Sequence, residues 1–314
     1  MDPAIKLKRG DVADVPCDVL LLKHADGFHG ADRLIANRIG FDDLLQDGEW
    51  KFWPGRGVGA KSVLFGGVGP LWKFRYEAIR LFARDALLQI GARHPEARSL
   101  ACTIHGPGYG LDEKEAFQAL LAGLLDGASD APHVHEIQIV ELDAKRVQRL
   151  KPVLRETLNL EPSARNTAEI VRPNFASVGK GSERKPLFVA MPFSEDFDDE
   201  YNIAFSEAAT LNGFLCERAD LASFTGDIVD WVRQRIETSA GLIALMNTAN
   251  ANVFLEIGYA WAKGIPTILA IKKGEAAPFN VKGQRFIEYR NIGDLRGRLT
   301  VEIAALKQEG MLTA

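Results

Sequence analysis

Short apolar runs recur along most of this sequence. Each has the length of a strand and few polar residues, which is typical of strands buried in a parallel sheet. The runs that predict such strands are residues 17–22, 62–65, 99–104, 135–140, 186–191, 214–217, 241–246 and 266–271. Residues 285–289 predict an edge strand.

Segments with helical character separate these runs. A helix that packs on a sheet faces the sheet with an apolar stripe, such as Ile79, Phe82, Ala83 and Leu87. The segments that predict helices are residues 31–39, 74–90, 112–127, 144–158, 199–212, 226–238, 252–263 and 291–306. Because strands and helices alternate, the sequence predicts the α/β class, as two three-layer α/β domains with mainly parallel sheets.

One stretch interrupts this alternation. Residues 159–185 carry two prolines and scattered Ser, Asn and Gly without a sustained period, which is typical of a linker. The sequence therefore predicts a domain at 1–158, a linker at 159–185 and a domain at 186–314. A length of 314 residues suits about two domains.

The stretch 239–272 predicts a strand, an Asn-rich loop, a helix and a second strand. Asn250 or Asn252 is expected to cap the helix. Glu256 would then lie in the first helical turn, at the carboxyl edge of the sheet, where open parallel sheets bind ligands. An acid there also suits the helix macrodipole. However, Glu256 is bracketed by apolar residues, and a carboxylate in such surroundings needs a partner or a function.

Two glycine-rich loops, 66–69 and 106–110, each follow a predicted strand and precede a predicted helix. Backbone N–H groups in such loops can cradle a phosphate. The candidate residues are Gly66, Gly67, Gly69, Gly106, Gly108 and Gly110. The alternative is that glycine only permits tight turns, since neither loop matches a phosphate-loop or dinucleotide fingerprint.

Composition and charge exclude several classes of partner. A net charge of −4 and a pI near 5.9 give no general attraction to nucleic acid or to anionic membranes. Cys17, Cys102 and Cys216 are far apart in apolar contexts, which predicts buried free thiols and no zinc site. No signal peptide or membrane span is expected, so we expect a cytoplasmic protein.

The N-terminal half resembles macro domains and the N-terminal domain of leucyl aminopeptidases. Residues 10–19 (GDVADVPCDV), residues 64–69 (LFGGVG) and the loop 106–110 carry this resemblance. It implies a macro-like fold that binds ADP-ribose or a related nucleotide, with Asp11 at the position of the adenine-contacting acid. The Asn-rich stretch of macro domains is here Lys-His-Ala-Asp at 23–26, so a scaffolding role is equally open.

The C-terminal half resembles nucleoside 2-deoxyribosyltransferases and bacterial Toll/interleukin-1-receptor-like (TIR-like) nucleotide-binding domains. The residues behind this are MPF at 191–193, RAD at 218–220, NVFLEIGYA at 252–260 and PFN at 278–280. The resemblance covers about 186–292 and implies a flavodoxin-like or TIR-like fold. Members cleave or transfer N-glycosidic bonds of nucleosides, nucleotides or NAD, and some are noncatalytic sensors.

The resemblance assigns the residue at the sugar anomeric carbon to Glu256. Tyr259, one turn along, would orient this carboxylate, and Asp220 or Asp198 would supply a second acid. The residues expected to bind the ligand are Met191, Pro192, Phe193, Ser194, Arg218, Asn247, Asn250 and Asn252.

One position departs from the pattern of that family. Its third strand typically ends in Ala-Asp, whereas here Ala244 is followed by Leu245. Two functions therefore stay open: an N-glycosidase or glycosyl transferase in bacterial antiviral signalling, and a noncatalytic sensor of nucleotides or ADP-ribose derivatives. A third reading is a structural interaction protein with two vestigial pockets. No cofactor is required, NAD or a nucleotide would be substrate or ligand, and a homo-oligomer is expected.

Overall fold

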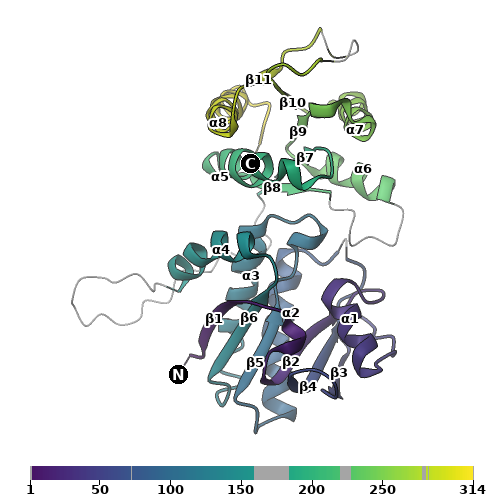
Figure 1. The fold of residues 1–314 in the computed structure, drawn as a ribbon, viewed down its shortest axis with the longest axis vertical. Helices are drawn as coiled ribbons and strands as arrows, with labels where there is room; N and C mark the ends of the chain where they lie inside the picture. Colours follow the sequence, from purple (N-terminus) through teal and green to yellow (C-terminus); the bar gives the residue numbers. More distant parts are fainter. Residues whose placement is uncertain are drawn as a thin grey trace, which may run out of the picture. The chain divides into compact units, whose positions relative to one another are not determined.

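The computed structural model describes residues 2–71, 73–158, 184–219, 228–277, 281 and 283–313. By their contacts these residues divide into two units, each described here by itself (Figure 1). The N-terminal unit comprises Met1–Pro107 and Glu113–Ser182, and the C-terminal unit comprises Gly108–Asp112 and Glu183–Ala314. Most of the predicted linker lies outside the described residues, so its boundaries stay a prediction.

The N-terminal unit is built on a six-stranded sheet with the order β1-β6-β5-β2-β4-β3. Its strands are β1 (Ala4–Arg9), β2 (Cys17–His24), β3 (Trp50–Pro54), β4 (Ala60–Gly67), β5 (Ser99–Thr103) and β6 (Glu136–Glu141). All pairs are parallel except β3 with β4. The central strand β2 carries the continuous apolar run, because both of its faces are covered.

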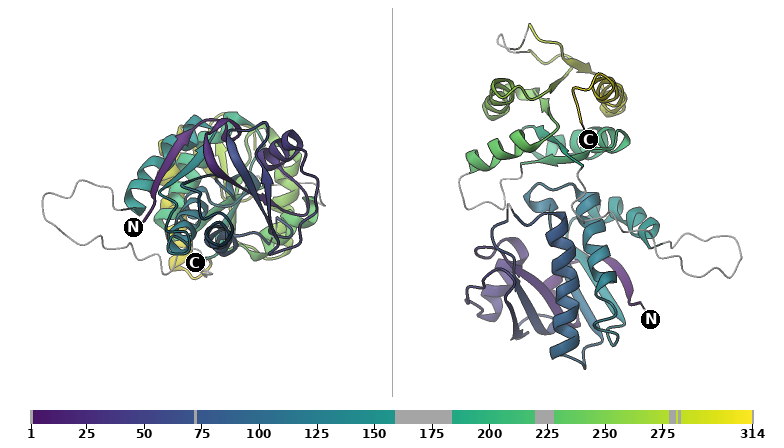
Figure 2. Two further views of the ribbon diagram at one scale, coloured as in Figure 1. Left: turned by 90° about the horizontal axis from the view of Figure 1, so that it is seen from below. Right: turned by 180° about the vertical axis from the view of Figure 1, so that it is seen from behind.

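Helices lie on both faces of this sheet. They are α1 (Gly30–Ile39), α2 (Tyr76–Arg93), α3 (Glu113–Asp126) and α4 (Ala144–Thr157). Leu20 and Leu22 of β2 share a core cluster with Ile35 and Ala36 of α1. Helices α2 and α3 lie side by side across the other face (Figure 2, right). The unit is therefore a three-layer α/β arrangement.

The C-terminal unit has a five-stranded sheet, and all of its strand pairs are parallel. Its strands are β7 (Pro186–Ala190), β8 (Leu215–Arg218), β9 (Gly241–Leu245), β10 (Thr267–Lys272) and β11 (Ile287–Tyr289). Their order, β11-β10-β9-β7-β8, is the flavodoxin-like arrangement, in which the chain reverses direction between the first strand and the third. Ligands of such sheets bind where this reversal occurs, which here is the edge beyond β7 and β9.

Alternating side chains of these strands supply two separate cores. Leu187 of β7 and Ile243 of β9 pack on the face that carries η5 (Glu200–Phe205), α5 (Ser206–Leu211) and α8 (Ile292–Gln308). Phe188 and Leu242 pack on the face that carries α6 (Ile228–Thr238) and α7 (Ala251–Ala262). Figure 1 shows these helices on either side of the strands.

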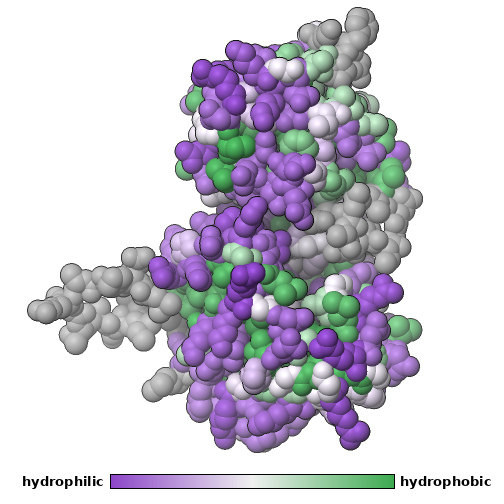
Figure 3. Space-filling model, viewed as in Figure 1, coloured by the Kyte–Doolittle hydropathy of each residue, from purple (hydrophilic) through white to green (hydrophobic). Residues whose placement is uncertain are grey.

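The predicted α/β class with mainly parallel sheets is confirmed. The main differences are local. Strands β1 and β3 have no counterpart among the predicted strands, and the predicted helix 199–212 begins as the π-helix η5 before it continues as α5. On the face drawn in Figure 3, hydrophilic side chains cover most of both units, and hydrophobic side chains form smaller patches.

Candidate functional site

The loop between β9 and α7 holds an unusual backbone. Thr248 and Ala249 both adopt positive φ angles, 62° and 47°, a conformation that is rare for residues other than glycine. Such strain persists only where the surrounding structure fixes it, and it is often found at functional sites. Asn250 follows and caps α7, since its side chain accepts hydrogen bonds from the backbone N–H groups of Asn252 and Val253. Of the two predicted caps, Asn250 is therefore the one used.

Helix α7 presents Glu256 to a cavity of about 290 Å³. The sequence predicts Glu256 in the first turn of this helix. Because α7 begins at Ala251, Glu256 lies in the second turn instead. The cavity lies within the C-terminal unit, between α6 and α7. Its lining residues are Phe193, Val229, Val232, Arg233, Ile236, Asn252, Leu255, Glu256 and Tyr259.

The carboxyl group of Glu256 is partly buried and stands among apolar groups. Desolvation, the one cause of the shift, raises its pKa from 4.5 to about 7. Among the described residues Glu256 makes no hydrogen bond and no ion pair. A desolvated carboxyl group without a partner, at a cavity, is the kind of group that functional sites use.

Apolar side chains form much of the rim of this cavity. Phe193, Val229 and Leu255 are 45%, 46% and 61% exposed, so three large hydrophobic side chains surround the opening. Exposed apolar groups that gather at a cavity are typical of a ligand-binding surface. A planar, weakly polar group such as a nucleobase would bury them.

Tyr259 lines the cavity, but its hydroxyl group does not serve the expected purpose. The hydroxyl donates a hydrogen bond of 2.5 Å to Glu237, and Lys263 pairs with the same carboxylate at 2.6 Å. The prediction that this hydroxyl orients Glu256 is therefore corrected: Tyr259 lines the cavity, and its hydroxyl group binds Glu237, which is not among the lining residues.

Asn247 is committed to the interior. It is 2% exposed, its amide nitrogen donates to the Tyr289 hydroxyl at 2.7 Å, and its oxygen accepts from the backbone N–H of Lys272 at 2.9 Å. Tyr289 in turn donates to Glu200 at 3.1 Å. These bonds join the ends of three neighbouring strands, β9, β10 and β11. Asn247 therefore supports the sheet edge, and the expectation that it binds the ligand is corrected.

The departure at Leu245 affects the site less than the sequence suggests. Leu245 is fully buried in the core that contains α5 and α8, on the opposite face of the sheet from α6 and α7. A side chain at this position therefore does not point towards the Glu256 cavity.

The loop after β7 contributes one residue to the cavity. Met191 and Pro192 are buried, Phe193 lines the opening, and the Ser194 side chain accepts from the backbone N–H of Asp196 as a helix cap. Arg218 lies over the Tyr201 ring at 4.4 Å and pairs with Asp198 at 3.4 Å. Asp198 is thus already paired. The other candidate acid, Asp220, and residues 278–280 lie outside the described residues.

The glycines of the first candidate loop have a packing role. Gly66 and Gly67 belong to strand β4, not to a loop. A Cβ atom at Gly66 would lie 2.5 Å from the Trp50 ring, and one at Gly67 would lie 1.9 Å from the Gln46 carbonyl oxygen. Glycine is therefore needed there for close packing, and only Gly69 follows the strand.

The second glycine loop is divided between the units. Gly106 belongs to the N-terminal unit, whereas Gly108 and Gly110 belong by their contacts to the C-terminal unit. There the backbone N–H of Arg218 donates to the Gly110 carbonyl oxygen at 3.2 Å. A Cβ atom at Gly110 would lie 2.0 Å from the Arg218 carbonyl oxygen, so close backbone approach requires this glycine. Asp11, in the N-terminal unit, accepts from the backbone N–H of Ala13 and caps a short 3-10 turn.

Buried polar residues gather where β2 and β5 end in the N-terminal unit. Lys23 and Asp32 form an ion pair of 2.5 Å with both side chains buried, and the His24 and Phe28 rings meet edge to face. His105 is 1% exposed, and neither ring nitrogen has a hydrogen-bond partner among the described residues. No role was predicted for these residues from sequence. The signal that could have revealed them is the polar residue types at the ends of two buried strands.

His105 is expected to make the protein less stable in acid. Burial lowers its pKa well below 6.5, so the folded protein holds this ring neutral. The unfolded chain binds a proton below pH 6.5, hence stability falls as pH decreases through that value, by up to about 1.4 kcal/mol per pH unit. Urea unfolding between pH 5 and 7.5 measures this slope. Because Glu256 contributes a slope of the opposite sign over part of this range, each variant is compared with the wild type. We expect His105→Phe to gain less stability, or lose more, than the wild type as pH rises from 5 through 6.5, and the exposed control His135→Gln to follow the wild type. A pH slope in His105→Phe equal to that of the wild type would contradict the assignment.

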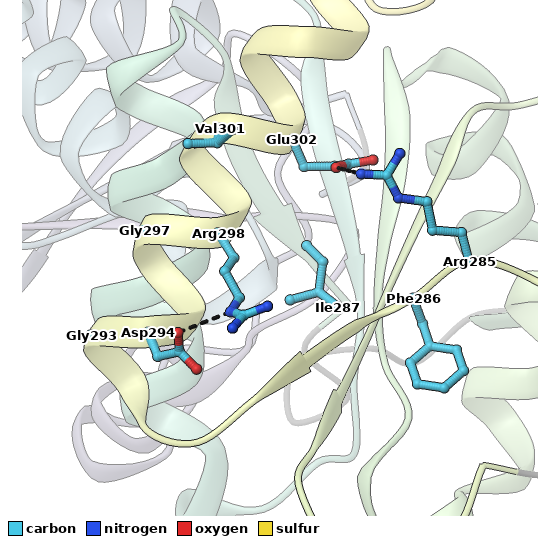
Figure 4. Close-up of a pocket in the computed structure, with 9 residues that line it drawn as sticks. All are labelled: Arg285, Phe286, Ile287, Gly293, Asp294, Gly297, Arg298, Val301 and Glu302. Carbon is cyan, nitrogen blue, oxygen red and sulfur yellow. Dashed lines mark hydrogen bonds and ion pairs between the residues drawn. The ribbon is translucent and has the colours of Figure 1, made fainter.

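A larger cavity of about 710 Å³ lies between β11 and α8 (Figure 4). Its charged residues are paired with one another: Arg285 with Glu302 at 2.8 Å and Arg298 with Asp294 at 2.9 Å. Each of these four groups has a partner of opposite charge, whereas the carboxyl group of Glu256 has none among the described residues. We therefore take the smaller cavity, with its unpaired carboxyl group, as the candidate site.

Two further observations concern only the part of the chain that the structure describes. It contains no group of His, Cys, Asp and Glu side chains suited to a metal ion, and no helix long and apolar enough to cross a membrane. The three cysteines are free and buried, as predicted.

Comparison with known proteins gives a likeness for one half of the chain. No protein-family model matches the chain, and no curated protein matches it. A Trypanosoma brucei macrodomain in complex with ADP is 20% identical, at a TM-score of 0.42, over 48% of this chain and 69% of that one. An Oceanobacillus iheyensis macrodomain mutant is 15% identical, at 0.41, over 51% and 95%.

The macro domain of ganglioside induced differentiation associated protein 2 is 18% identical, at a TM-score of 0.38, over 48% of this chain and 83% of that one. Each of these structures is similar to this chain over about half of its length. The macro-like character of the N-terminal half stays a prediction. The resemblance of the C-terminal half to deoxyribosyltransferases and TIR-like domains stays a prediction.

Proposed function

We propose that the C-terminal unit binds a nucleoside or nucleotide in the Glu256 cavity and cleaves its N-glycosidic bond. One observation carries this proposal: Glu256 is desolvated and unpaired among the described residues, and it borders a cavity beside the edge of a parallel sheet. The same edge is where sheets of this topology bind ligands. The apolar rim suits a flat base, and the carboxylate suits the sugar.

The chemistry requires a carboxylate at the anomeric carbon. As the bond from C1′ to the base nitrogen breaks, its electron pair leaves with the base, and positive charge develops on the sugar. A carboxylate oxygen of Glu256 either attacks C1′ or stabilises this charge. Water then adds to C1′ and gives up a proton to solvent, which frees the carboxylate where a covalent bond had formed. Nicotinamide leaves as a neutral base, whereas adenine takes up a proton from solvent as it leaves. A desolvated carboxylate serves this step better than a hydrated one, because less water must be removed.

This role predicts how activity depends on pH. Glu256 must be ionised to act at C1′, and its pKa lies at about 7. Base release should therefore increase as pH rises through about 7 and level off above that value. A carboxyl group that acted as a proton donor to the leaving base would give the opposite trend.

A noncatalytic nucleotide sensor is the second candidate, and one observation favours it. Among the described residues that line the cavity, Glu256 is the one with a carboxyl group. Asp198, which could have supplied a second acid, is paired with Arg218. With a single carboxyl group among its described lining residues, the cavity could hold a ligand without turning it over.

Incubation of the purified protein with nucleosides, deoxynucleosides, nucleotides and NAD, followed by chromatography for free base, separates the two candidates. A glycosidase releases base from at least one of them. A sensor releases none but is stabilised against heat by the ligand that it binds. If no compound released free base and none stabilised the protein against heat, both functions would be contradicted.

A further inference from the structure

Arg233 is the one cation among the described residues that line the Glu256 cavity. It belongs to the face of α6 that also carries Val229, Val232 and Ile236, residues that are three or four positions apart and therefore lie along one side of the helix. The other three are apolar. Arg233 is thus the polar group that α6 offers to a ligand in the cavity.

The guanidinium group lies near the wall that carries Glu256. Its carbon is 5.6 Å from the centre of the Tyr259 ring, and Tyr259 follows Glu256 by about one helical turn. The pKa of Glu256 is nevertheless raised, with desolvation as its one cause. Arg233 therefore does not neutralise Glu256, and the two charged groups are free to engage different parts of one ligand.

Little holds Arg233 in its present contacts. Its side chain is 48% exposed, and its ion pair with Asp230 on the same helix measures 3.2 Å between exposed groups. Exposed pairs at this spacing contribute only a few tenths of a kcal/mol in general, so a bound anion replaces them easily. Guanidinium groups bind phosphate oxygens through two parallel N–H donors.

We propose that Arg233 binds a phosphate group of the ligand, so that the Glu256 site prefers a nucleoside 5′-phosphate to the free nucleoside. This inference rests on the proposed function of the same cavity. A volume of about 290 Å³ is at the small end for ligand sites, so it suits a sugar and base with the phosphate at the opening. In a dinucleotide, the half farther from the cleaved bond would extend beyond the cavity.

Nicotinamide riboside, nicotinamide mononucleotide and NAD form a matched test series, because they share the same base, sugar and glycosidic bond. Adenosine and AMP form a second pair. For each, we would measure base release and, by calorimetry, the Kd. We expect Arg233→Gln to raise the KM and the Kd for the phosphate-bearing members by about 10- to 100-fold and to leave those for the nucleosides unchanged. Arg233→Lys should recover part of the loss.

Arg296→Gln is the matched control. Arg296 is an exposed arginine on α8 that pairs with Glu207 at 2.7 Å, and we expect its loss to change neither constant. Equal use of nucleosides and their phosphates by the wild type, or an equal loss for both in Arg233→Gln, would overturn the phosphate assignment while glycosidase activity remained. Tighter binding of the phosphates that depends on Arg233, without base release from any compound, would instead overturn the glycosidase and keep the assignment.

Discussion

The Glu256→Gln variant is expected to release free base at least about 100-fold more slowly than the wild type. Glutamine keeps the size of the side chain and its hydrogen-bonding oxygen, but it cannot ionise. The charge that would stabilise the sugar cation, or the oxygen that would attack C1′, is therefore lost. Initial rates of base release at pH 8, where the wild-type carboxyl group is ionised, measure the effect. Release that continues unchanged would remove Glu256 from the mechanism.

This variant should not fail by unfolding. The folded pKa of Glu256, about 7, lies above its ordinary value of 4.5, so folding disfavours the ionised form. Stability therefore falls as pH rises from about 4.5 through 7, and above that range the cost approaches about 3 kcal/mol. Glutamine removes this cost, and Glu256→Gln should be at least as stable as the wild type at pH 8. Glu237→Gln is the control for losing a carboxylate that binds Tyr259 but does not line the cavity.

The Arg235→Met variant is expected to lower the free energy of unfolding by about 3 to 5 kcal/mol. Arg235 of α6 forms an ion pair with Glu217 of β8, and these side chains are 9% and 0% exposed. Without the arginine, Glu217 keeps its place inside the unit but loses its cation. Because α6 also forms one wall of the cavity, ligand binding should weaken with it. Urea unfolding of the whole chain measures the change.

Two further variants test whether the loss of stability comes from breaking the Arg235–Glu217 ion pair or only from removing the arginine side chain. In Glu217→Leu combined with Arg235→Met, the buried charges are removed together, and most of the stability should return. Arg233→Met, two residues away in an exposed pair, should change stability by less than about 0.5 kcal/mol. A double variant that is no more stable than Arg235→Met alone would show that the ion pair is not the cause.

Much of the fold could be predicted from sequence because buried strands and packed helices have a clear local pattern. The order of apolar runs in the C-terminal half leads directly to a parallel sheet, and each predicted strand there is found. Strand β3 was missed because it is an edge strand of mixed character, WKFWP, with partly exposed side chains. The role of Gly66 depends on Trp50, a residue from another strand, and no local pattern reveals that contact.

The site was predictable only in part, for the same reason. Glu256 and its desolvation follow from the apolar residues around it in sequence. The partners of Tyr259 and Asn247 do not, because Glu237 and Tyr289 lie 22 and 42 residues away along the chain. Arg233 was not singled out, since one charged residue on an amphipathic helix usually faces solvent. That Arg233 lines the same cavity as Glu256 depends on how α6 packs against α7, which no local sequence pattern reveals.

Titration of the Glu256 side-chain carboxyl group by carbon-13 NMR tests the central claim most directly. Its signal can be assigned by comparison with Glu256→Gln. We predict a pKa of about 7 in the free protein and a change in that pKa when a nucleotide is added. A pKa near 4.5 that no nucleotide alters would show that this carboxyl group is solvated and distant from any ligand, which would contradict the proposed function.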